Sequence, residues 1–302
     1  MNDSINLTED KGTQKSNSLS KKIIIAWILG IFALSASGWV GLILERYFDI
    51  QGSYKYGIPA LCMSGTILSG IWLLRNRLDK GTPRSIGLGK FKPSILKFLL
   101  GMGLIIVPLI LTLSIGQLAG WGNVTVHFEE SIVVPLIGGM IVVFFFEALP
   151  EELLFRGYIF SNLNTKYKRW ISALITIGLF AILPVILGFV QKYVIGMDIA
   201  FGGSDTITLS YFLNMIFFGA FVQYLRILTG SVWTGIGFHL IFVFMNHLIG
   251  LEPTNFIQVS DFDSEVPVQI TLLSSIALVF ITLLLYPKIT KRKLGWKELS
   301  ES

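Results

Sequence analysis

The residues best suited to chemistry lie in one acidic segment, Phe146-Glu147-Ala148-Leu149-Pro150-Glu151-Glu152-Leu153-Leu154-Phe155-Arg156-Gly157. On a helix, Glu152 and Arg156 are four residues apart and form a natural ion pair. Glu151 points about 100° away from Glu152 and is free to face something else. A free glutamate beside a braced one is suited to act as a general base. The alternative interpretation is that these acids only cap an interfacial helix.

Pro150 decides how this segment can be built. Proline has no backbone N–H, so a helix either kinks there or begins afresh with the proline in its first turn. A fresh start would place Glu151 and Glu152 where the helix dipole favours negative charge. Carboxylates at membrane depth are costly and usually face a bundle interior or a water-filled cavity. The segment therefore predicts a polar site inside a membrane bundle.

His239 is the histidine that could join this site. It follows the turn Gly230-Ser231-Val232-Trp233 and lies within an apolar run. A single histidine in such a run is often a hydrogen-bonded packing residue, so lining a site and packing both stay open. Asn214, Gln223 and Asn246 are the remaining polar residues of the nearby apolar runs, and we expect them to hydrogen-bond between helices.

Composition identifies the elements that must position these residues. Of 302 residues 53% are hydrophobic and 14% are charged, against about 25% charged in a typical soluble domain. Crossing a hydrocarbon core takes roughly 20 apolar residues. We predict an all-α polytopic membrane protein with about eight transmembrane helices, and seven or nine stay possible. The predicted spans are Ile23–Leu44, Gly57–Leu74, Ile95–Leu118, Ile132–Phe146, Ile171–Val190, Ile207–Leu225, Val232–Ile249 and Val268–Leu285.

The basic residues give an independent test of this topology. With both termini in the cytoplasm and eight alternating spans, only Arg46, Lys55 and Lys192 of the 24 Lys and Arg residues fall outside. Cytoplasmic segments of membrane proteins carry such an excess of Lys and Arg. The basic residues behind the net charge of +5 are therefore expected to face the anionic inner leaflet, and they require no nucleic-acid partner. The expected location is the plasma membrane of a bacterium, with membrane lipids as partners.

The chain divides into four predicted parts. Residues 1–22 are polar and are expected to form a disordered cytoplasmic tail. Residues 23–129 hold the first three spans, 130–250 form a helical core with the acidic segment and His239, and 251–302 hold the last span and a basic cytoplasmic tail. The chain has a single cysteine, Cys62, which lies within a span. Because a second cysteine is missing, an intrachain disulfide and a cysteine metal cluster are ruled out.

The core resembles a known family. The run Glu-Glu-Leu-Leu-Phe-Arg-Gly-Tyr, residues 151–158, is similar to the first motif, Glu-Glu-x-x-x-Arg, of the CAAX protease and bacteriocin-processing family of intramembrane endopeptidases, also called Abi or Rce-type. The resemblance covers roughly residues 130–250. It implies a helical membrane fold, an endopeptidase activity, and a site in which Glu151, Glu152, Arg156 and His239 take part.

Two motifs of the family are incomplete in this chain. The second is Phe-x-x-x-His; Phe180 stands at the phenylalanine position and Pro184 at the histidine position. The third is His-x-x-x-Asn or His-x-x-x-Asp after a Gly-Ser-x-Trp turn; His239 fits, but position 243 is valine. Asn246 is seven residues after His239, about two turns further along a helix. The assisting histidine and the oxyanion asparagine of the family are therefore missing.

The resemblance implies Glu151 as the base, Glu152 and Arg156 as a bracing pair, and His239 as a polar stabiliser. Zinc ordinarily takes three protein ligands and a water. Glu151, Glu152 and His239 are the only such set here, so we expect no cofactor and no tightly bound metal, with weakly bound zinc left open.

Two functions follow from this inventory. The first is an intramembrane endopeptidase that cleaves a peptide or membrane protein near the inner leaflet. The second is a catalytically weakened or inactive member, a pseudoenzyme, acting as a scaffold, regulator or bacteriocin-immunity factor on another membrane protein. The residues thus leave open whether the chain is an enzyme. A secondary transporter would need two related halves with broken helices, and the sequence has no such symmetry.

Overall fold

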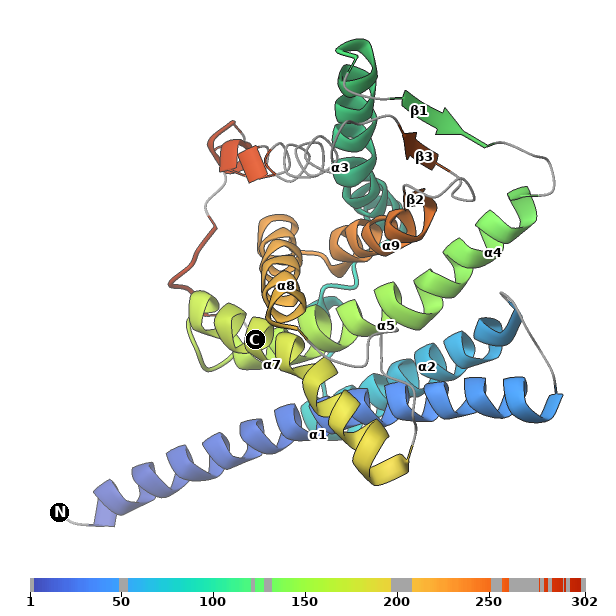
Figure 1. Cartoon of the computed structure of the whole chain (residues 1–302). Coiled ribbons are helices and arrows are strands. Elements are labelled where there is room, and N and C mark those ends of the chain that lie inside the picture. Colours follow the sequence, from blue (N-terminus) through green and yellow to red (C-terminus); the bar gives the residue numbers. More distant parts are fainter. Residues whose placement is uncertain are drawn as a thin grey trace.

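The apolar runs of the sequence form a bundle of long helices in the computed structural model (Figure 1). The structure describes residues 3–48, 54–120, 123–127, 132–196, 208–250, 257–260, 277, 280–281, 284–289, 291 and 294–299. Six helices in this part are long and apolar enough to cross a membrane, and a shorter apolar helix covers Val232–Asn246. The prediction of an all-α polytopic membrane protein is therefore confirmed.

Helices α1 and α2 cover Asp3–Phe48 and Tyr54–Leu73, and a wider π turn extends α2 over Leu74–Asp79. A short 3-10 turn, Pro83–Ile86, leads to α3, Phe91–Leu118. After strand β1, Asn123–Val126, one long helix contains α4 Val133–Val143, α5 Leu149–Glu152 and α6 Phe160–Leu163. The remaining elements are α7 Arg169–Phe189, α8 Leu209–Thr229, α9 Val232–Leu248, β2 Ile249–Gly250 and β3 Ile257–Ser260.

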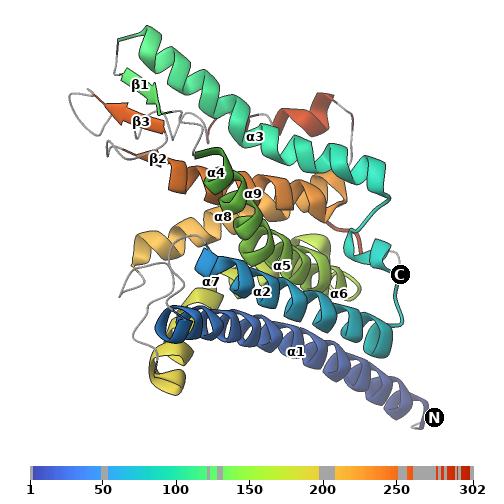
Figure 2. The same ribbon diagram turned by 90° about the vertical axis from the view of Figure 1, so that its right-hand side faces the viewer.

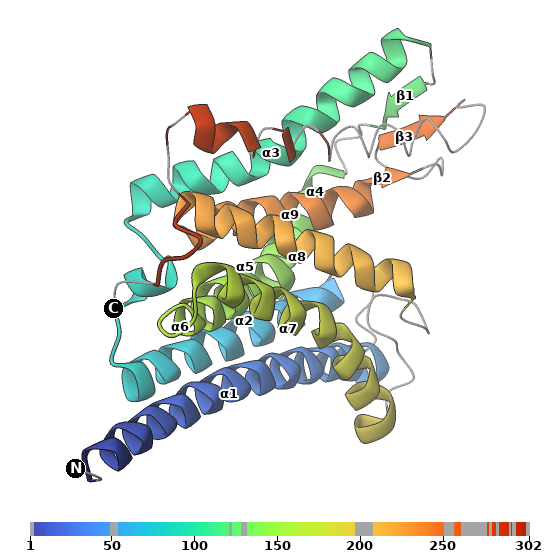
Figure 3. The same cartoon turned by 90° about the vertical axis from the view of Figure 1, so that its left-hand side faces the viewer.

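The long helix α4–α6 lies between two pairs of helices. It contacts α1 and α2 on one side and α9 on the other, and α3 packs on the outer face of α9 (Figure 3). Buried side chains of α5, α6 and the turn between them, among them Phe155 and Ile159, join the largest apolar core together with Leu34 of α1 and Ile236 of α9. The acidic segment thus sits in the middle of the bundle.

Helix α3 and helix α9 approach each other at backbone distance. A Cβ added at Gly101 would lie 2.1 Å from the carbonyl oxygen of Thr234, and one added at Gly237 would lie 2.1 Å from that of Phe98. Only glycine allows this approach, as is common where membrane helices pack closely. The two helices therefore form a tight pair along one side of the molecule (Figure 2).

The helix ends gather at two opposite ends of the bundle. At the basic end, Lys22 of α1 pairs with Asp79 after α2 at 2.8 Å, and the Lys97 ammonium donates to the Thr229 carbonyl of α8 at 2.9 Å. At the other end, β1 pairs antiparallel with β3, and β2 pairs parallel with β3. This sheet end joins the segment after α3 to the segment after α9. Both segments are predicted to lie outside, so the alternation of the spans is consistent with the structure.

Two sequence predictions differ from the structure, and a third concerns residues that lie mostly outside the described part of the chain. The fourth span does not end at Phe146: the helix runs from Val133 to Leu163 and includes the whole acidic segment. Residues 3–22, which we predicted as a disordered tail, are helical and continuous with the first span, because extending an existing helix avoids the cost of nucleation. The predicted eighth span, Val268–Leu285, lies mostly outside the described residues, although 277, 280–281 and 284–289 are helical.

Candidate functional site

The acidic segment is held in a helix that runs through Pro150 without a break. Its turns widen to π geometry at Phe144–Ala148 and at Leu153–Ile159. In the first of these wide turns, hydrogen bonds join residues five apart, as from the Leu149 amide to the Phe144 carbonyl. Pro150 has no N–H to give to the next carbonyl, that of Phe145. The hydroxyl of Ser64 on α2 donates to this carbonyl instead, which allows the helix to continue into the glutamates.

Glu152 is the centre of a buried polar cluster. Its Oε1 atom accepts from Arg156 Nη1 at 3.0 Å and lies 3.1 Å from His239 Nδ1 on α9. The exposed fractions are 0% for Glu152, 1% for Arg156 and 3% for His239. A carboxylate at such depth requires charged or hydrogen-bonded partners. The predicted ion pair between Glu152 and Arg156 is confirmed, and the structure brings His239 to the same atom.

Arg156 has further contacts that fix its guanidinium. Its Nη2 donates to the Gly219 carbonyl of α8 at 3.3 Å. Its carbon Cζ lies 4.2 Å from the centre of the Phe180 ring on α7, a cation–π distance. The imidazole of His239 packs against the Phe218 ring with 4.7 Å between ring centres. Four helices thus contribute to the cluster.

Two glycines leave the space that this cluster needs. A Cβ at Gly235 of α9 would lie 2.9 Å from Glu152 Oε2 and 2.8 Å from Val222. A Cβ at Gly219 would lie 3.2 Å from the Phe180 ring and 3.5 Å from Arg156 Nη2. Sequence reasoning missed both positions. The sequence signal for Gly235 was its position one helical turn before His239. The signal for Gly219 was a glycine near the middle of α8.

Glu151 faces a separate small cavity. The cavity has a volume of about 20 Å³ and is lined by Glu151 together with Leu34, Phe180, Leu183, Pro184, Leu187 and Met215. One water molecule needs about 10–15 Å³, so the space suits a single water beside the carboxylate. Glu151 has an exposed fraction of 9% and lies within electrostatic reach of His239 and Glu147.

His239 lies within electrostatic reach of Glu151, but its hydrogen bond is made to the neighbouring glutamate. His239 is hydrogen-bonded to Glu152, the glutamate that Arg156 also holds. The reason is the rotation of α5 about its axis, which turns Glu152 toward α9 and Glu151 toward α7 and α1. The sequence spacing fixed the angle between the two glutamates but not which helix each would face.

Residues 133–245 match a family model described as type II CAAX prenyl endopeptidase, Rce1-like. The match covers α4 to α9 and contains every residue of the cluster. We call this part of the chain the Rce1-like core, after the family model that it matches. No curated protein and no solved structure matches the chain.

The two incomplete motifs lie on α7 and α9 of the Rce1-like core. Pro184 lines the cavity beside Glu151, so the position that resembles the histidine of the second motif does face the free glutamate. Helix α7 continues through Pro184 to Phe189. At the third motif, Val243 packs against the apolar core, and Asn246 is exposed. Asn246 therefore does not stand in for the missing asparagine.

The donor atoms of the Rce1-like core do not make a zinc site. Glu152 Oε1 is already engaged by Arg156 and His239. Among the described residues, no group of three His, Cys, Asp or Glu side chains lies close enough to hold a metal ion. A zinc site would need three such ligands, and the described residues do not bring three together.

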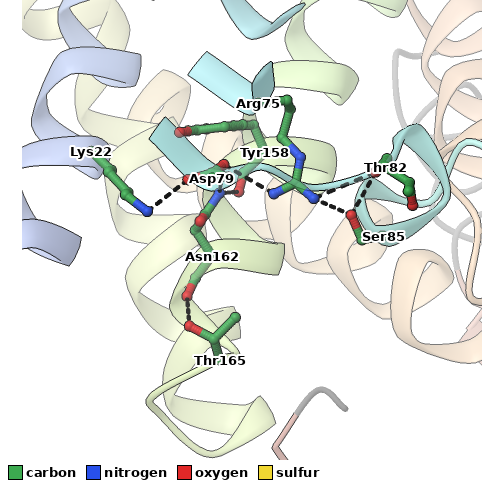
Figure 4. A network of polar contacts seen from close by, with 8 residues as sticks. All are labelled: Lys22, Arg75, Asp79, Thr82, Ser85, Tyr158, Asn162 and Thr165. Carbon is green, nitrogen blue, oxygen red and sulfur yellow. Dashed lines mark hydrogen bonds and ion pairs between the residues drawn. The ribbon is translucent and has the colours of Figure 1, made fainter. Parts of the chain in front are cut away.

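A polar network anchors the core at the basic end (Figure 4). Asp79, after α2, pairs with Lys22 at 2.8 Å and with Arg75 at 2.9 Å. Asn162 of α6 donates to Asp79 at 3.4 Å and to the Tyr158 carbonyl at 3.0 Å. The network joins α1, α2 and α6 two turns beyond Arg156. Sequence analysis gave Asp79 no role, because its partners lie on other elements.

Tyr211 was also missed by sequence analysis. It lies in the first turn of α8, within electrostatic reach of Glu151 and Glu147. A tyrosine hydroxyl can donate or accept a hydrogen bond, so the polar surroundings of Glu151 include a group from α8. No pattern in the sequence points to this residue.

Proposed function

We propose that the chain is an intramembrane endopeptidase that cleaves a peptide or a membrane-protein segment near the inner leaflet of a bacterial plasma membrane. The observation that carries the proposal is the cavity for one water beside Glu151, next to the buried Glu152, Arg156 and His239 cluster. The family match supports the reaction class, and the multi-pass fold supports a membrane-embedded substrate.

The residues present can supply the steps of amide hydrolysis. Glu151 takes a proton from the water, whose oxygen attacks the carbonyl carbon of the scissile bond. The C–N bond then breaks, and Glu151 returns the proton to the leaving amine. His239 keeps Nε2 unused by Glu152, and as an imidazolium it would donate from Nε2 to the oxyanion. Glu152 and Arg156 position His239 and do not touch the substrate.

Turnover is expected to be slow. Pro184 offers Glu151 no imidazole, and Val243 offers the oxyanion no amide. A positioned general acid–base group typically contributes ~10²–10⁴ in rate, and loss of one oxyanion donor costs ~10²–10³. The reduced site should therefore cleave far more slowly than a site with all three motifs.

Glu151→Gln in purified full-length protein tests the proposal. The variant keeps the shape of the side chain and removes the base, so cleavage of a peptide library in detergent should fall to background. Glu147→Gln, one turn away on the same helix, is the matched control and should retain most of the activity. Equal cleavage by the wild type and Glu151→Gln would disprove the role of Glu151.

The second candidate is a non-catalytic member that binds another membrane protein, as a scaffold, regulator or bacteriocin-immunity factor. Pro184 at the cavity and Val243 in the core favour it specifically. It predicts a biological effect that tolerates Glu151→Gln but requires the packing of the Glu152 cluster. A growth or protection assay in cells that express the wild type or Glu151→Gln separates the two functions.

A further inference from the structure

A large apolar pocket lies on the opposite side of α8 from the Glu151 cavity. It has a volume of about 710 Å³, within the range of roughly 300–1,000 Å³ typical of small-molecule sites. Helices α7 and α8 form two walls, and Ala277, Phe280, Leu284 and Trp296 form the third. The residues around Trp296 lie against the start of α7 (Figure 1). Leu174, Phe217 and Phe280 line the pocket and are also exposed, so the pocket opens sideways to the lipid.

Gln223 is the polar group inside this pocket. Its exposed fraction is 1%, and neither its Oε1 nor its Nε2 atom has a hydrogen-bond partner among the described residues. Our prediction that Gln223 bonds to another helix is therefore wrong. A buried amide without partners costs free energy, and this one lines a space that a ligand can enter. Both amide atoms lie just beneath the pocket wall, so a rotation of the Gln223 side chain would bring the amide to a carbonyl or hydroxyl of that ligand.

The depth of the pocket matches one leaflet. It extends along α8 from Ile227 to Phe217, about 15 Å at 1.5 Å per residue, and half of the hydrocarbon core is also ~15 Å. Trp170, Tyr224 and Trp296 line its basic end. Aromatic side chains of this kind gather where the hydrocarbon meets the head groups.

Exposed cations adjoin the same end of the pocket. Lys168 precedes Trp170 by two residues, Lys297 follows Trp296, and Lys288 lies one turn beyond Leu284. The Trp170 amide donates to the Trp296 carbonyl at 3.2 Å. Lys168 and Lys297 therefore lie on either side of this backbone contact. Such a rim attracts the phosphate of an anionic head group.

We propose that this pocket is a binding site for an anionic phospholipid of the inner leaflet. The acyl chains occupy the apolar walls, an ester carbonyl accepts from Gln223 Nε2, and the phosphate lies at the lysine rim. The site lies apart from Glu151 and is independent of the proposed peptidase activity.

Native mass spectrometry of the purified full-length protein tests this site, with phosphatidylglycerol and phosphatidylcholine as probes. The wild type should retain phosphatidylglycerol in preference to phosphatidylcholine. Ala220→Trp fills the pocket and should abolish that preference. Gln223→Leu removes one hydrogen bond and should weaken phosphatidylglycerol binding by about threefold to tenfold.

Ile110→Trp is the matched control, because it adds the same ring at an exposed position of α3 outside the pocket. It should bind lipid as the wild type does. Equal retention of the two lipids by the wild type would overturn the proposal, as would unchanged phosphatidylglycerol binding by Ala220→Trp. A copurifying polypeptide or a second copy of the chain at the pocket, in place of lipid, would overturn it as well.

Discussion

Arg156 and Glu152 illustrate how a polar pair can exist inside a membrane bundle. The two groups pair through Glu152 Oε1 and Arg156 Nη1, and the guanidinium also contacts the carbonyl of Gly219 and the ring of Phe180. Lysine could not replace arginine here, because a single ammonium cannot reach two acceptors in the planar arrangement of a guanidinium. The pair is thus an obligatory part of the core rather than an optional surface contact.

Removing Arg156 should destabilise the fold strongly. Arg156→Ala leaves the Glu152 carboxylate with His239 as its remaining hydrogen-bonding partner, and breaking a buried pair costs about 3–5 kcal/mol. Unfolding in mixed micelles measures the loss. The exposed Lys168→Ala should change stability by less than ~0.5 kcal/mol. In the double variant Glu152→Gln/Arg156→Ala the loss should be smaller than the sum of the single losses, and strict additivity would argue against the pair.

Gly235 should be as sensitive as the charged residues. Gly235→Ala places a methyl group 2.9 Å from Glu152 Oε2 and 2.8 Å from Val222, and such overpacking typically costs 1–3 kcal/mol. Gly178 on α7 is the control, since a Cβ there meets nothing within 4 Å. Gly178→Ala should be neutral or stabilise the helix by up to ~1 kcal/mol. Thermal unfolding of both variants in the same detergent compares them directly, and equal midpoints would contradict the crowding at Gly235.

At the scale of elements, the α4–α6 helix depends on a residue far from it in sequence. The Phe145 carbonyl lacks a donor because Pro150 has no N–H, and Ser64 on α2 supplies one. This contact connects the first half of the chain to the segment that carries the glutamates. A helix that would otherwise kink at the proline can therefore present Glu151 and Glu152 at adjacent positions of one surface.

Ser64→Ala should weaken this element. It leaves a buried carbonyl unpaired, which typically costs 1–3 kcal/mol. Ser69→Ala, on the same helix, is the control, because the Ser69 hydroxyl donates to Gly65 of its own helix and is exposed; it should change little. Hydrogen exchange of the amides of Phe144–Ala148 should rise in Ser64→Ala alone. Unchanged exchange there would show that the Phe145 carbonyl does not need Ser64.

Sequence reasoning succeeded where spacing along one helix decides the outcome. The pair of Glu152 and Arg156 follows from a separation of four residues, and the spans follow from apolar length. It failed where two helices must be rotated against each other. The partner of His239, the donor to Phe145 and the unpaired amide of Gln223 each depend on contacts between elements distant in the chain, and hydropathy contains no such information.

At the scale of the whole molecule, the distribution of charge predicts the orientation in the membrane. The ends that bear Lys22, Lys97 and Arg169 meet on one side of the bundle, and the three-stranded sheet lies on the other. The positive-inside rule then assigns the basic end to the cytoplasm. The described helices agree with this alternation up to the end of α9.

Cysteine labelling in whole cells checks that orientation. In a variant that lacks Cys62, single cysteines introduced within 80–92 or 290–300 should be protected from a membrane-impermeant reagent. Single cysteines within 252–264 should react. Permeabilised cells provide the control, because every one of these positions should then react. External labelling within 80–92 would reverse the assignment of both ends.

The close approach of α3 and α9 determines how a substrate could reach Glu151. Main chains in contact at Gly101 and Gly237 cannot part without loss of the whole interface, so this side of the molecule is a fixed wall. The Glu151 cavity is instead closed by the side chains of Leu34, Leu187 and Met215, which can change rotamer. A polypeptide would then reach Glu151 past the side chains of α1, α7 and α8 that line the cavity. Entry past these side chains would add a conformational step to the slow bond cleavage.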